Sequence, residues 1–336
     1  MRFPSCVEIS KDACAKTGEI INQLRLQGKA AVFCPAQISE IGNKVLSSVE
    51  NEYDIFEPSS IEESDLRKTA EIVKGYDFAI GIGGGKAIDI AKYSSYLAGK
   101  PWIAIPTSLS NDSIASGRAS LSNEGRKITV PASEPAAIII DIDIISKAPY
   151  RFIASGAGDA LSKLSAIEDW RIADADGKEK MHSVISSLSI VAAEAVIKHA
   201  EQIRNQDERG MEILSWALIC SGFAMNMMGS SRPGSGSEHN FSHALDEMGT
   251  TALHGEQVAI GTIIMQYLQR KDWMHVKKIM EQLGLPTKLS EIGIDKKKAI
   301  KALVDARNVR DRYTILNKVD INEEKAEEIL KHVDVI

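Results

Sequence analysis

Residues 77–99 read DFAIGIGGGKAIDIAKYSSYLAG: an apolar run, a run of glycines and then a helical pattern. The apolar run at 77–83 is typical of a buried strand, and residues 87–99 have the spacing of an amphipathic helix. Four of the five residues 81–85 are glycine, more than a tight turn needs. Glycines between a strand and a helix let backbone N–H groups approach a phosphate, and the helix N-terminus adds its dipole. The stretch therefore predicts a βαβ unit with a phosphate-binding loop.

The same alternation continues on both sides of this stretch. Buried strands are predicted at 30–34, 53–57, 101–107 and 136–141, with helices at 38–49 and 61–76 and a hairpin around 120–130. Short apolar strands alternating with helices indicate a parallel sheet. The loop matches neither GxGxxG nor GxxxxGK[ST], so we interpret it as a dinucleotide loop of another lineage.

The pattern changes near residue 150, beyond which long helical periodicities replace the strands. Helices are predicted at 158–174, 181–203, 207–228, 237–249 and 256–272, followed by three shorter ones. The Gly/Ser-rich stretch GSSRPGSGSE at 229–238 is short and reads as a connection inside this helical part. We therefore predict an α/β Rossmann-like domain at 1–153 and an all-α domain at 154–336.

Composition excludes several classes of protein. The formal net charge of −6 gives no overall attraction to nucleic acid, so anionic ligands must be held by local groups. The four cysteines have no metal-finger spacing and suit a reducing cytosol. The most apolar stretch, 136–145, contains Asp141 and Asp143 and is too short to cross a membrane. Because the N-terminus lacks the apolar core of a signal peptide, we expect a cytoplasmic protein without membrane insertion.

A polar cluster follows the strand at 101–107. Its members are Thr107, Ser108, Ser110, Asn111, Asp112 and Ser116. Ligands of open parallel sheets bind at the carboxyl ends of the strands, where these residues fall. The same residue types are also common in ordinary loops, so both interpretations stay open at this point.

Three histidines and one aspartate suggest a metal site. His239 and His243 are one helical turn apart, His254 precedes the next helix, and Asp159 stands near the start of the first long helix. Two or three histidines with a carboxylate form the ligand set of a catalytic Zn²⁺ or Fe²⁺. Spacing alone does not decide which histidines bind the metal. The remaining histidines are interpreted as structural: His182, His199, His275 and His332.

Five motifs, taken together, resemble a known family. They are GIGGGKAIDIAK (81–92), IPTSLSNDSIAS (105–116), SGAGDALSK (155–163), SSRPGSGSEHNFSHALD (230–246) and LHGEQVAIGT (253–262). In this order they resemble the sn-glycerol-1-phosphate dehydrogenases, within the superfamily of iron-containing alcohol dehydrogenases, glycerol dehydrogenase and dehydroquinate synthase. The resemblance implies that superfamily's fold, with the active site in the cleft between a Rossmann-like and an all-α domain.

The resemblance also implies roles for individual residues. The metal ligands would be Asp159, His239 and His254, while His243 would contact substrate and handle a proton. Asp159 would contact substrate as well as metal, and Asp112 would face the substrate. The dinucleotide would lie over Gly83, Gly84, Gly85, Lys86, Ala87, Ile88, Asp89, Thr107, Ser108, Leu109, Ser110 and Ser116.

The implied reaction is the reversible reduction of dihydroxyacetone phosphate to sn-glycerol 1-phosphate, the backbone of archaeal-type phospholipids. A Zn²⁺ ion, the expected metal, would polarise the carbonyl as hydride arrives from the nicotinamide. The substrate phosphate needs cationic partners, for which Lys163 and Arg232 are the candidates. The alternative is that these two side chains pair with neighbouring carboxylates.

Cofactor choice follows from the end of the strand at 30–34. A carboxylate here normally accepts the ribose hydroxyls of NAD and repels the extra phosphate of NADP. The chain has no Asp or Glu until Glu40. We therefore expect both NADH and NADPH to be used.

Three rival functions remain. Glycerol dehydrogenase would need no phosphate site, and a dehydroquinate-synthase-like cyclase would need more basic residues around the histidines. A non-catalytic nucleotide-binding regulator would be marked by a broken ligand set, and here the ligand set is complete. The helical half has faces suited to self-association, so we also expect a homo-oligomer.

Overall fold

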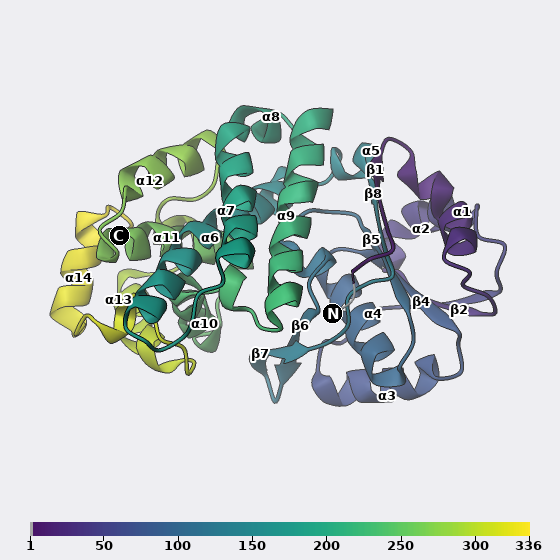
Figure 1. Cartoon of the computed structure of the whole chain (residues 1–336), viewed down its shortest axis with the longest axis horizontal. Coiled ribbons are helices and arrows are strands. Elements are labelled where there is room, and N and C mark those ends of the chain that lie inside the picture. The colour runs from purple at the N-terminus through teal and green to yellow at the C-terminus, as the bar shows by residue number, and fades with distance from the viewer. Residues whose placement is uncertain (1–2) are drawn as a thin grey trace. The chain divides into compact units, whose positions relative to one another are not determined.

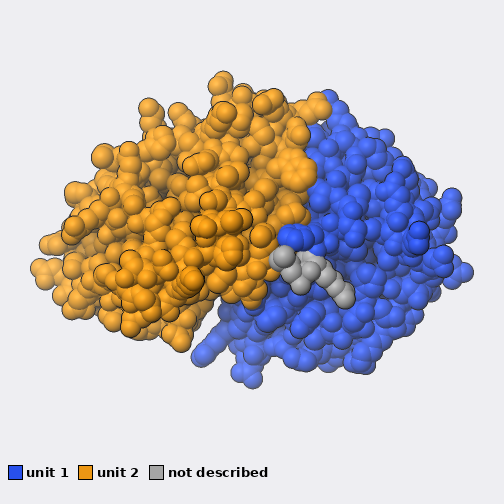
Figure 2. All heavy atoms as spheres, in the orientation of Figure 1, with its two compact units in different colours: residues 1–149 blue, residues 150–336 orange. Residues whose placement is uncertain are grey.

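The computed structural model describes residues 3–336, and the chain divides into two compact units, residues 1–149 and 150–336 (Figure 2). The sequence placed this boundary between 153 and 154. Residues 150–153 instead form the first turn of helix α6 (Tyr150–Ala175), which belongs to the second unit.

The first unit is built on a six-stranded parallel sheet in the order β1-β8-β5-β4-β2-β3 (Figure 1). Its strands are β1 (Cys6–Ser10), β2 (Ala30–Phe33), β3 (Tyr53–Phe56), β4 (Phe78–Gly83), β5 (Trp102–Pro106) and β8 (Ala137–Asp141). Gly83 lies opposite Pro106, and the Thr107 N–H donates to the Gly83 carbonyl (3.0 Å). The glycine loop and the polar segment after β5 therefore leave the sheet side by side.

Helices cover both faces of this sheet (Figure 1). The helices of this unit are η1 (Ala13–Lys16), α1 (Thr17–Gln23), η2 (Ala36–Ile38), α2 (Ser39–Leu46), α3 (Glu63–Val73), α4 (Gly85–Ala98), η3 (Asp112–Ile114) and α5 (Ile142–Ile145). Strand side chains alternate between the faces, so Ile80 and Ile82 share a core with α1 and α2 while Gly81 faces α4. The predicted hairpin is the antiparallel pair β6 (Arg118–Asn123) and β7 (Arg126–Pro131).

Strand β1 was not predicted. Its sequence, CVEIS, carries a glutamate, and none of its residues is fully buried, because β1 is an edge strand paired only with β8. An edge strand of this kind lacks the continuous apolar run that marks the central strands.

The described residues of the second unit form helices and no strand, as predicted. The elements after α6 are α7 (Ser183–Lys198), α8 (Ala200–Arg204), α9 (Glu208–Met228), η4 (Arg232–Gly234), α10 (Ser237–Glu247), α11 (His254–Leu268), α12 (Trp273–Gln282), η5 (Leu289–Ile292), α13 (Lys296–Asp305), η6 (Ala306–Asn308), η7 (Ile315–Asn317) and α14 (Glu323–His332). The helix predicted at 181–203 is in fact two, α7 and α8, separated at His199.

Helix α9 is long and apolar enough to cross a membrane by length and composition alone, and it is the one such helix among residues 3–336. In the most apolar part of α9, 56% of the residues are buried inside the fold. It packs against α7 and contributes Ala224 to a core with Trp170 of α6 and Ile185 of α7.

Candidate metal centre and dinucleotide loop

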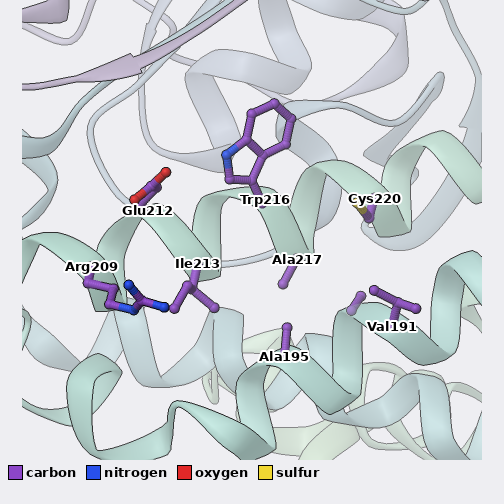
Figure 3. Close-up of a pocket in the computed structure, with 9 residues that line it drawn as sticks. Val191, Ala195, Arg209, Glu212, Ile213, Trp216, Ala217 and Cys220 are labelled. Carbon is purple, nitrogen blue, oxygen red and sulfur yellow. The ribbon is translucent and has the colours of Figure 1, made fainter.

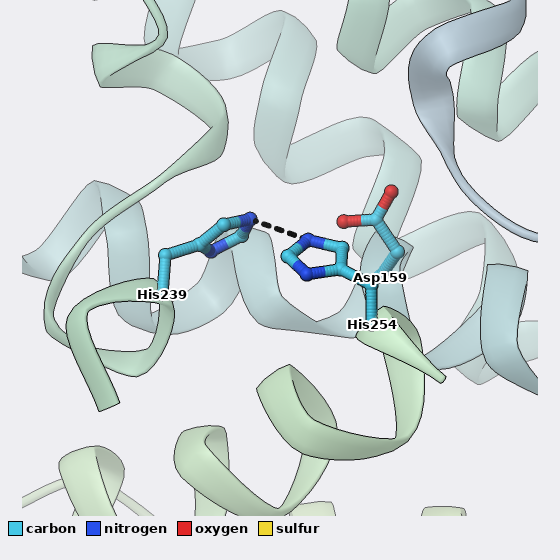
Figure 4. A group of neighbouring side chains, drawn as sticks. All are labelled: Asp159, His239 and His254. Atoms are coloured by element: carbon cyan, nitrogen blue, oxygen red, sulfur yellow. Dashed lines mark hydrogen bonds between the residues drawn. The ribbon is translucent and has the colours of Figure 1, made fainter. Parts of the chain in front are cut away.

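Asp159, His239 and His254 come from three helices of the second unit and meet at one point (Figure 4). Asp159 lies on α6, His239 in the first turn of α10, and His254 is the first residue of α11. One ligand atom from each lies within 4.8 Å of the other two, and the two Nε2 atoms are 3.2 Å apart. We call these three residues the metal group.

A close crossing of α6 and α11 places Asp159 beside His254. A Cβ on Gly158 would lie 2.5 Å from the Gly255 carbonyl oxygen, and a Cβ on Gly255 would lie 1.8 Å from the Ser155 carbonyl oxygen. Only glycine lets the two backbones come this close. Glycine is a weak helix former, and Gly156 and Gly158 precede Asp159, which is why the sequence placed Asp159 near the start of its helix, whereas α6 begins at Tyr150.

His239 is oriented by the adjacent Glu238. The Glu238 Oε1 atom accepts from the Gly236 N–H (2.6 Å) and lies 2.7 Å from His239 Nδ1, so Nδ1 carries the hydrogen. Burial, followed by the charge of His254, lowers the pKa of His239 well below its usual range. Burial and the charge of Asp169 raise the pKa of Glu238 to about 7. His239 is therefore a neutral imidazole with its lone pair on Nε2.

A chain of hydrogen bonds assigns the same tautomer to His254. Gln257 Nε2 donates to Asp246 Oδ1 and to the Ala252 carbonyl (both 3.2 Å), which leaves Gln257 Oε1 to accept from the Ser242 hydroxyl (2.8 Å). Ser242 Oγ must then accept from His254 Nδ1, at 3.4 Å. The lone pair of His254 is consequently also on Nε2.

Two imidazole lone pairs thus face each other beside a carboxylate; the dashed line in Figure 4 joins the two nitrogens. This arrangement is repulsive unless a cation lies between them. Neutral imidazoles and a carboxylate are ligands of catalytic Zn²⁺ and Fe²⁺, and a hydrogen bond from the other ring nitrogen orients such ligands. The residues of the metal group therefore fit a divalent metal ion.

His243 lies beside the metal group but outside it. It follows His239 by one turn of α10, and its Nδ1 lies 4.0 Å from Asp246 Oδ2. The charge of His243 is among those that depress the pKa of His239, as expected for a close neighbour. The sequence left open which histidines cluster, and the structure groups His239 with His254.

The two cations proposed for a substrate phosphate both have carboxylate neighbours. The buried Lys163 donates from Nζ to Asp159 Oδ1 (2.8 Å) and to the Gly234 carbonyl (3.3 Å). The buried Arg232 has its Nε 3.1 Å from Glu179 Oε2. The alternative raised from the sequence, pairing with carboxylates, thus describes these contacts, and phosphate binding by either residue stays a prediction.

The glycine loop presents a polar cradle at the start of α4, in the first unit. Gly83 has φ +143°, which L side chains rarely adopt. A Cβ on Gly85 would lie near Asn111 Nδ2 (3.6 Å), Ser113 Oγ (3.7 Å) and Ser110 Oγ (3.8 Å). Ser113 Oγ is buried without a hydrogen-bond partner among residues 3–336. Together with the N–H groups of the first turn of α4, these atoms fit a phosphate of a dinucleotide.

Several predicted cofactor residues have buried side chains. Those with buried apolar side chains are Ala87, Ile88 and Leu109. Asp89 is buried and accepts from Lys92 Nζ (2.9 Å) and from the Ser120 N–H (3.2 Å), and burial raises the pKa of Asp89. The Asp89 carboxylate thus stabilises the unit itself.

The remaining predicted residues of the first unit differ in exposure. Lys86 is exposed and donates to the Ser59 carbonyl (2.7 Å). Ser116 is buried and donates to the Arg118 carbonyl (3.4 Å). Those that are partly exposed are Gly84, Thr107, Ser108, Ser110 and Asp112.

Comparison with known proteins places the chain in a family. The family profile described as iron-containing alcohol dehydrogenase matches residues 8–149. The glycerol-1-phosphate dehydrogenase [NAD(P)+] of Pyrococcus abyssi is 38% identical over 343 aligned positions, which cover 100% of this chain and 99% of that protein. The chain belongs to the glycerol-1-phosphate dehydrogenase family.

Solved structures share the fold of this glycerol-1-phosphate dehydrogenase family member. Glycerol dehydrogenase from Schizosaccharomyces pombe superposes with a TM-score of 0.81 at 22% identity, covering 99% of this chain and 90% of that one. Sulfoacetaldehyde reductase from Bifidobacterium kashiwanohense, solved in complex with NAD⁺, gives a TM-score of 0.78 at 16% identity, with coverage of 99% and 97%. At these identities the likeness establishes the fold alone.

Two arginines of this glycerol-1-phosphate dehydrogenase family member were missed in the sequence. Arg310 donates to Asn240 Oδ1 (3.0 Å), and Asn240 directly follows the metal-group residue His239. Arg312 donates to Ser231 Oγ (3.0 Å). The sequence does show two arginines separated by one residue in VRDRYT (309–314). This spacing predicts no site by itself, because only the fold brings the segment to the loop before α10.

Proposed function

We propose that this chain catalyses the reversible, NAD(P)H-dependent reduction of dihydroxyacetone phosphate to sn-glycerol 1-phosphate. The observation that carries the proposal is the metal group, whose two facing imidazole lone pairs and carboxylate suit a Lewis-acid metal. Full-length similarity to proteins named glycerol-1-phosphate dehydrogenase [NAD(P)+] supports the choice of substrate. The product would supply the glycerophosphate backbone of archaeal-type phospholipids, made in the cytoplasm.

The proposed metal ion, for which we favour Zn²⁺, would be held by Asp159, His239 and His254, and it would supply polarisation of the substrate carbonyl. The chain's own residues do the rest. Glu238 and Ser242 hold the two imidazole rings in position through their Nδ1 atoms.

His243 is the proposed proton donor to the oxygen that forms the product hydroxyl. An imidazole titrates in the physiological range, so it can give a proton in one direction of the reaction and take it back in the other. Its place beside the metal group, one turn from His239, supports this role.

We propose that the dinucleotide lies over the glycine loop and uses NAD or NADP. The polar cradle above Gly85 and the N-terminus of α4 support a site for its phosphates. One carboxylate that the sequence analysis did not weigh is Glu57, just after β3, whose Oε2 accepts from the Ala36 N–H beyond β2 (2.7 Å). A carboxylate at this place favours NADH, so we propose that both cofactors are used and that NADH is preferred. Values of kcat/KM for NADH and NADPH that differ more than about a thousandfold would contradict dual use.

We also propose that the chain forms a homodimer through a pocket on α7 and α9, the α7–α9 pocket (Figure 3). Figure 3 shows Ile213 and Ala217 of α9 pointing toward Val191 and Ala195 of α7, with Trp216 turned away from α7. Val191 and Trp216 are exposed although they are large and apolar. Two charged residues line the pocket, Arg209 and Glu212. In a two-fold dimer, Arg209 of one copy would pair with Glu212 of the other, so the face is complementary to itself.

One assay tests the catalytic proposal. Metal-loaded protein is mixed with NADH and either dihydroxyacetone phosphate or unphosphorylated dihydroxyacetone, and the stereochemistry of the product is determined. We expect turnover to prefer the phosphorylated ketone and to yield sn-glycerol 1-phosphate. A preference for dihydroxyacetone would indicate a glycerol dehydrogenase instead, and no hydride transfer to either ketone would contradict the proposal.

A further inference from the structure

Three arginines of the second unit converge on the segment that connects α9 to α10. Arg232 lies within this segment and donates from Nη2 to the Asp169 carbonyl (3.0 Å). Arg310 donates to Ser235 Oγ (2.8 Å), and Arg312 donates to the Ser235 carbonyl. We call Arg232, Arg310 and Arg312 the arginine cluster.

The two arginines from the C-terminal segment have no carboxylate in ion-pair distance within residues 3–336. Every hydrogen bond that Arg310 and Arg312 make there ends on a neutral oxygen, of a serine, an asparagine or the backbone. Burial, with the charge of Arg312, lowers the pKa of Arg310 to about 9. Burial, with the charge of Arg232, lowers the pKa of Arg312 to about 10. Arg310 and Arg312 are partly buried and Arg232 is buried. Cations that are withdrawn from water and repel one another in this way are stabilised by an anion supplied from outside.

Unused hydrogen-bond donors at the same place point to an anion as well. Arg232 is 1% exposed, and its Nη1 has no hydrogen-bond partner among the described residues. Asn240 is 0% exposed; its Oδ1 accepts from Arg310, and its Nδ2 has no partner among residues 3–336. Buried N–H groups without an acceptor are rare because each costs the free energy of a lost hydrogen bond.

The arginine cluster is next to the metal group. Lys163 Nζ bridges Asp159 Oδ1 and the Gly234 carbonyl, and so joins the metal group to the connecting segment. Arg310 donates to Asn240 Oδ1 (3.0 Å), and Asn240 directly follows the metal-group residue His239 on α10. One small molecule with an anionic group bound to the cluster would therefore reach the metal group with its other end.

We propose that Arg310 and Arg312, with Arg232, bind the phosphate of the substrate and so make the enzyme selective for a phosphorylated ketone. This inference rests on the proposed function, and it adds the residues that set its substrate class. A dianion at this place would accept from the guanidinium groups and from Asn240 Nδ2, while the ketone of the same molecule reaches the metal group. The cluster recognises phosphate, and the metal group recognises the carbonyl.

The kinetic test uses Arg310→Gln and Arg312→Gln, with Arg307→Gln as the matched control. Arg307 is exposed and lies three residues before Arg310. We expect kcat/KM for dihydroxyacetone phosphate to fall about 10- to 100-fold in each cluster variant, mainly through KM, because each loses a charge-assisted hydrogen bond. With dihydroxyacetone the variants should stay within about threefold of the wild type, since its binding does not use the cluster. An equal loss with both ketones would mean a structural role and would overturn the proposal.

A second measurement does not depend on turnover. The thermal unfolding midpoint of the metal-loaded protein is measured during titration with inorganic phosphate, against sodium chloride at equal ionic strength. Phosphate should raise the midpoint of the wild type and of Arg307→Gln more than that of Arg310→Gln, and Arg310→Lys should recover part of the difference. Equal midpoint shifts in the wild type and Arg310→Gln would contradict an anion site at the cluster. A wild type that reduces neither ketone but shows the phosphate-dependent difference would refute the proposed function and leave the anion site standing.

Discussion

His239 and His243 occupy the same face of α10 but have different surroundings. His239 is 7% exposed, and Glu238 fixes its ring through Nδ1. The lone pair on Nε2 therefore points in one fixed direction. His243 is more exposed, and its Nδ1 lies 4.0 Å from Asp246 Oδ2. One residue is built as a fixed ligand, and the other has the access that a proton carrier needs.

Removing the two histidines one at a time separates these roles. We expect His239→Ala to lower metal affinity by more than about 100-fold, since even losing a partner of a ligand costs 10- to 100-fold. His243→Ala should keep one metal per chain while kcat falls about 10²- to 10⁴-fold, the range for a lost general acid. Metal analysis after gel filtration and steady-state kinetics check both. Full metal content in His239→Ala would refute the ligand assignment.

Gly85 allows an equally local test of the dinucleotide loop. The three atoms nearest to a Cβ at this position lie at 3.6–3.8 Å, and Gly85 has no positive φ, so alanine fits the protein itself. The methyl group would, however, stand in the polar cradle. We expect Gly85→Ala to keep its thermal midpoint and metal content while its dissociation constant for NADH rises about tenfold or more. Unchanged NADH affinity, measured by fluorescence titration, would argue against phosphate binding in this cradle.

At the scale of elements, α4 is tied to the segment that follows β5 by one buried lysine. Lys92 Nζ donates to Asp89 Oδ1 on its own helix and to the carbonyls of Ser113 (2.7 Å) and Arg118 (2.6 Å). These carbonyls belong to η3 and β6, which frame the cradle. A single ammonium group therefore holds the polar cluster of the sequence in position over the glycine loop.

Comparing Lys92→Met with Lys74→Met isolates the effect of burial. Both lysines pair with a carboxylate three residues earlier, but the Lys92–Asp89 side chains are 0% and 8% exposed and those of Lys74–Glu71 are 52% and 70% exposed. Lys92→Met leaves a buried carboxylate and two carbonyls without their donor and should cost about 3–5 kcal/mol of unfolding free energy. Lys74→Met should change little. Denaturant unfolding measures both, and similar losses would contradict this account.

What could be predicted about elements depended on whether the pattern was local. The central strands β2, β4 and β5 are buried on both faces and carry continuous apolar runs, so they were predicted close to their bounds. The start of α6 was missed because Gly156 and Gly158 look unlike a helix. Gly158 is required by its contact with Gly255 of α11, about a hundred residues later, which no local pattern records.

At the scale of the whole molecule, some residues of the candidate site could be predicted from the sequence and others could not. Asp159, His239 and His254 were nominated by residue type and selected through the family resemblance, and the fold brings them together. Arg310 and Arg312 stood in a segment with no recognised motif. Only the packing of α13 and η6 against α10 carries that segment to the loop before α10.

Self-association is the property that belongs to the molecule as a whole. If two copies pair through the α7–α9 pocket, Trp216→Glu places a charge in an apolar interface, and we expect dimers to dissociate into monomers. Met274→Glu is the control, because Met274 is also a large, exposed apolar residue but lies on α12. Gel filtration with light scattering at micromolar concentration measures the mass of each species.

A charge exchange across the proposed two-fold axis makes the test specific to this face. Arg209 and Glu212 lie one turn apart on α9, so a two-fold axis between two copies of the helix sets Arg209 of one against Glu212 of the other. Arg209→Glu alone should weaken the dimer by placing like charges together, and so should Glu212→Arg alone. The double exchange restores opposite charges and should recover the dimer. A monomeric wild type would contradict the proposed dimer. A double variant that loses as much dimer as the two single variants combined would show that the copies do not pair through this face.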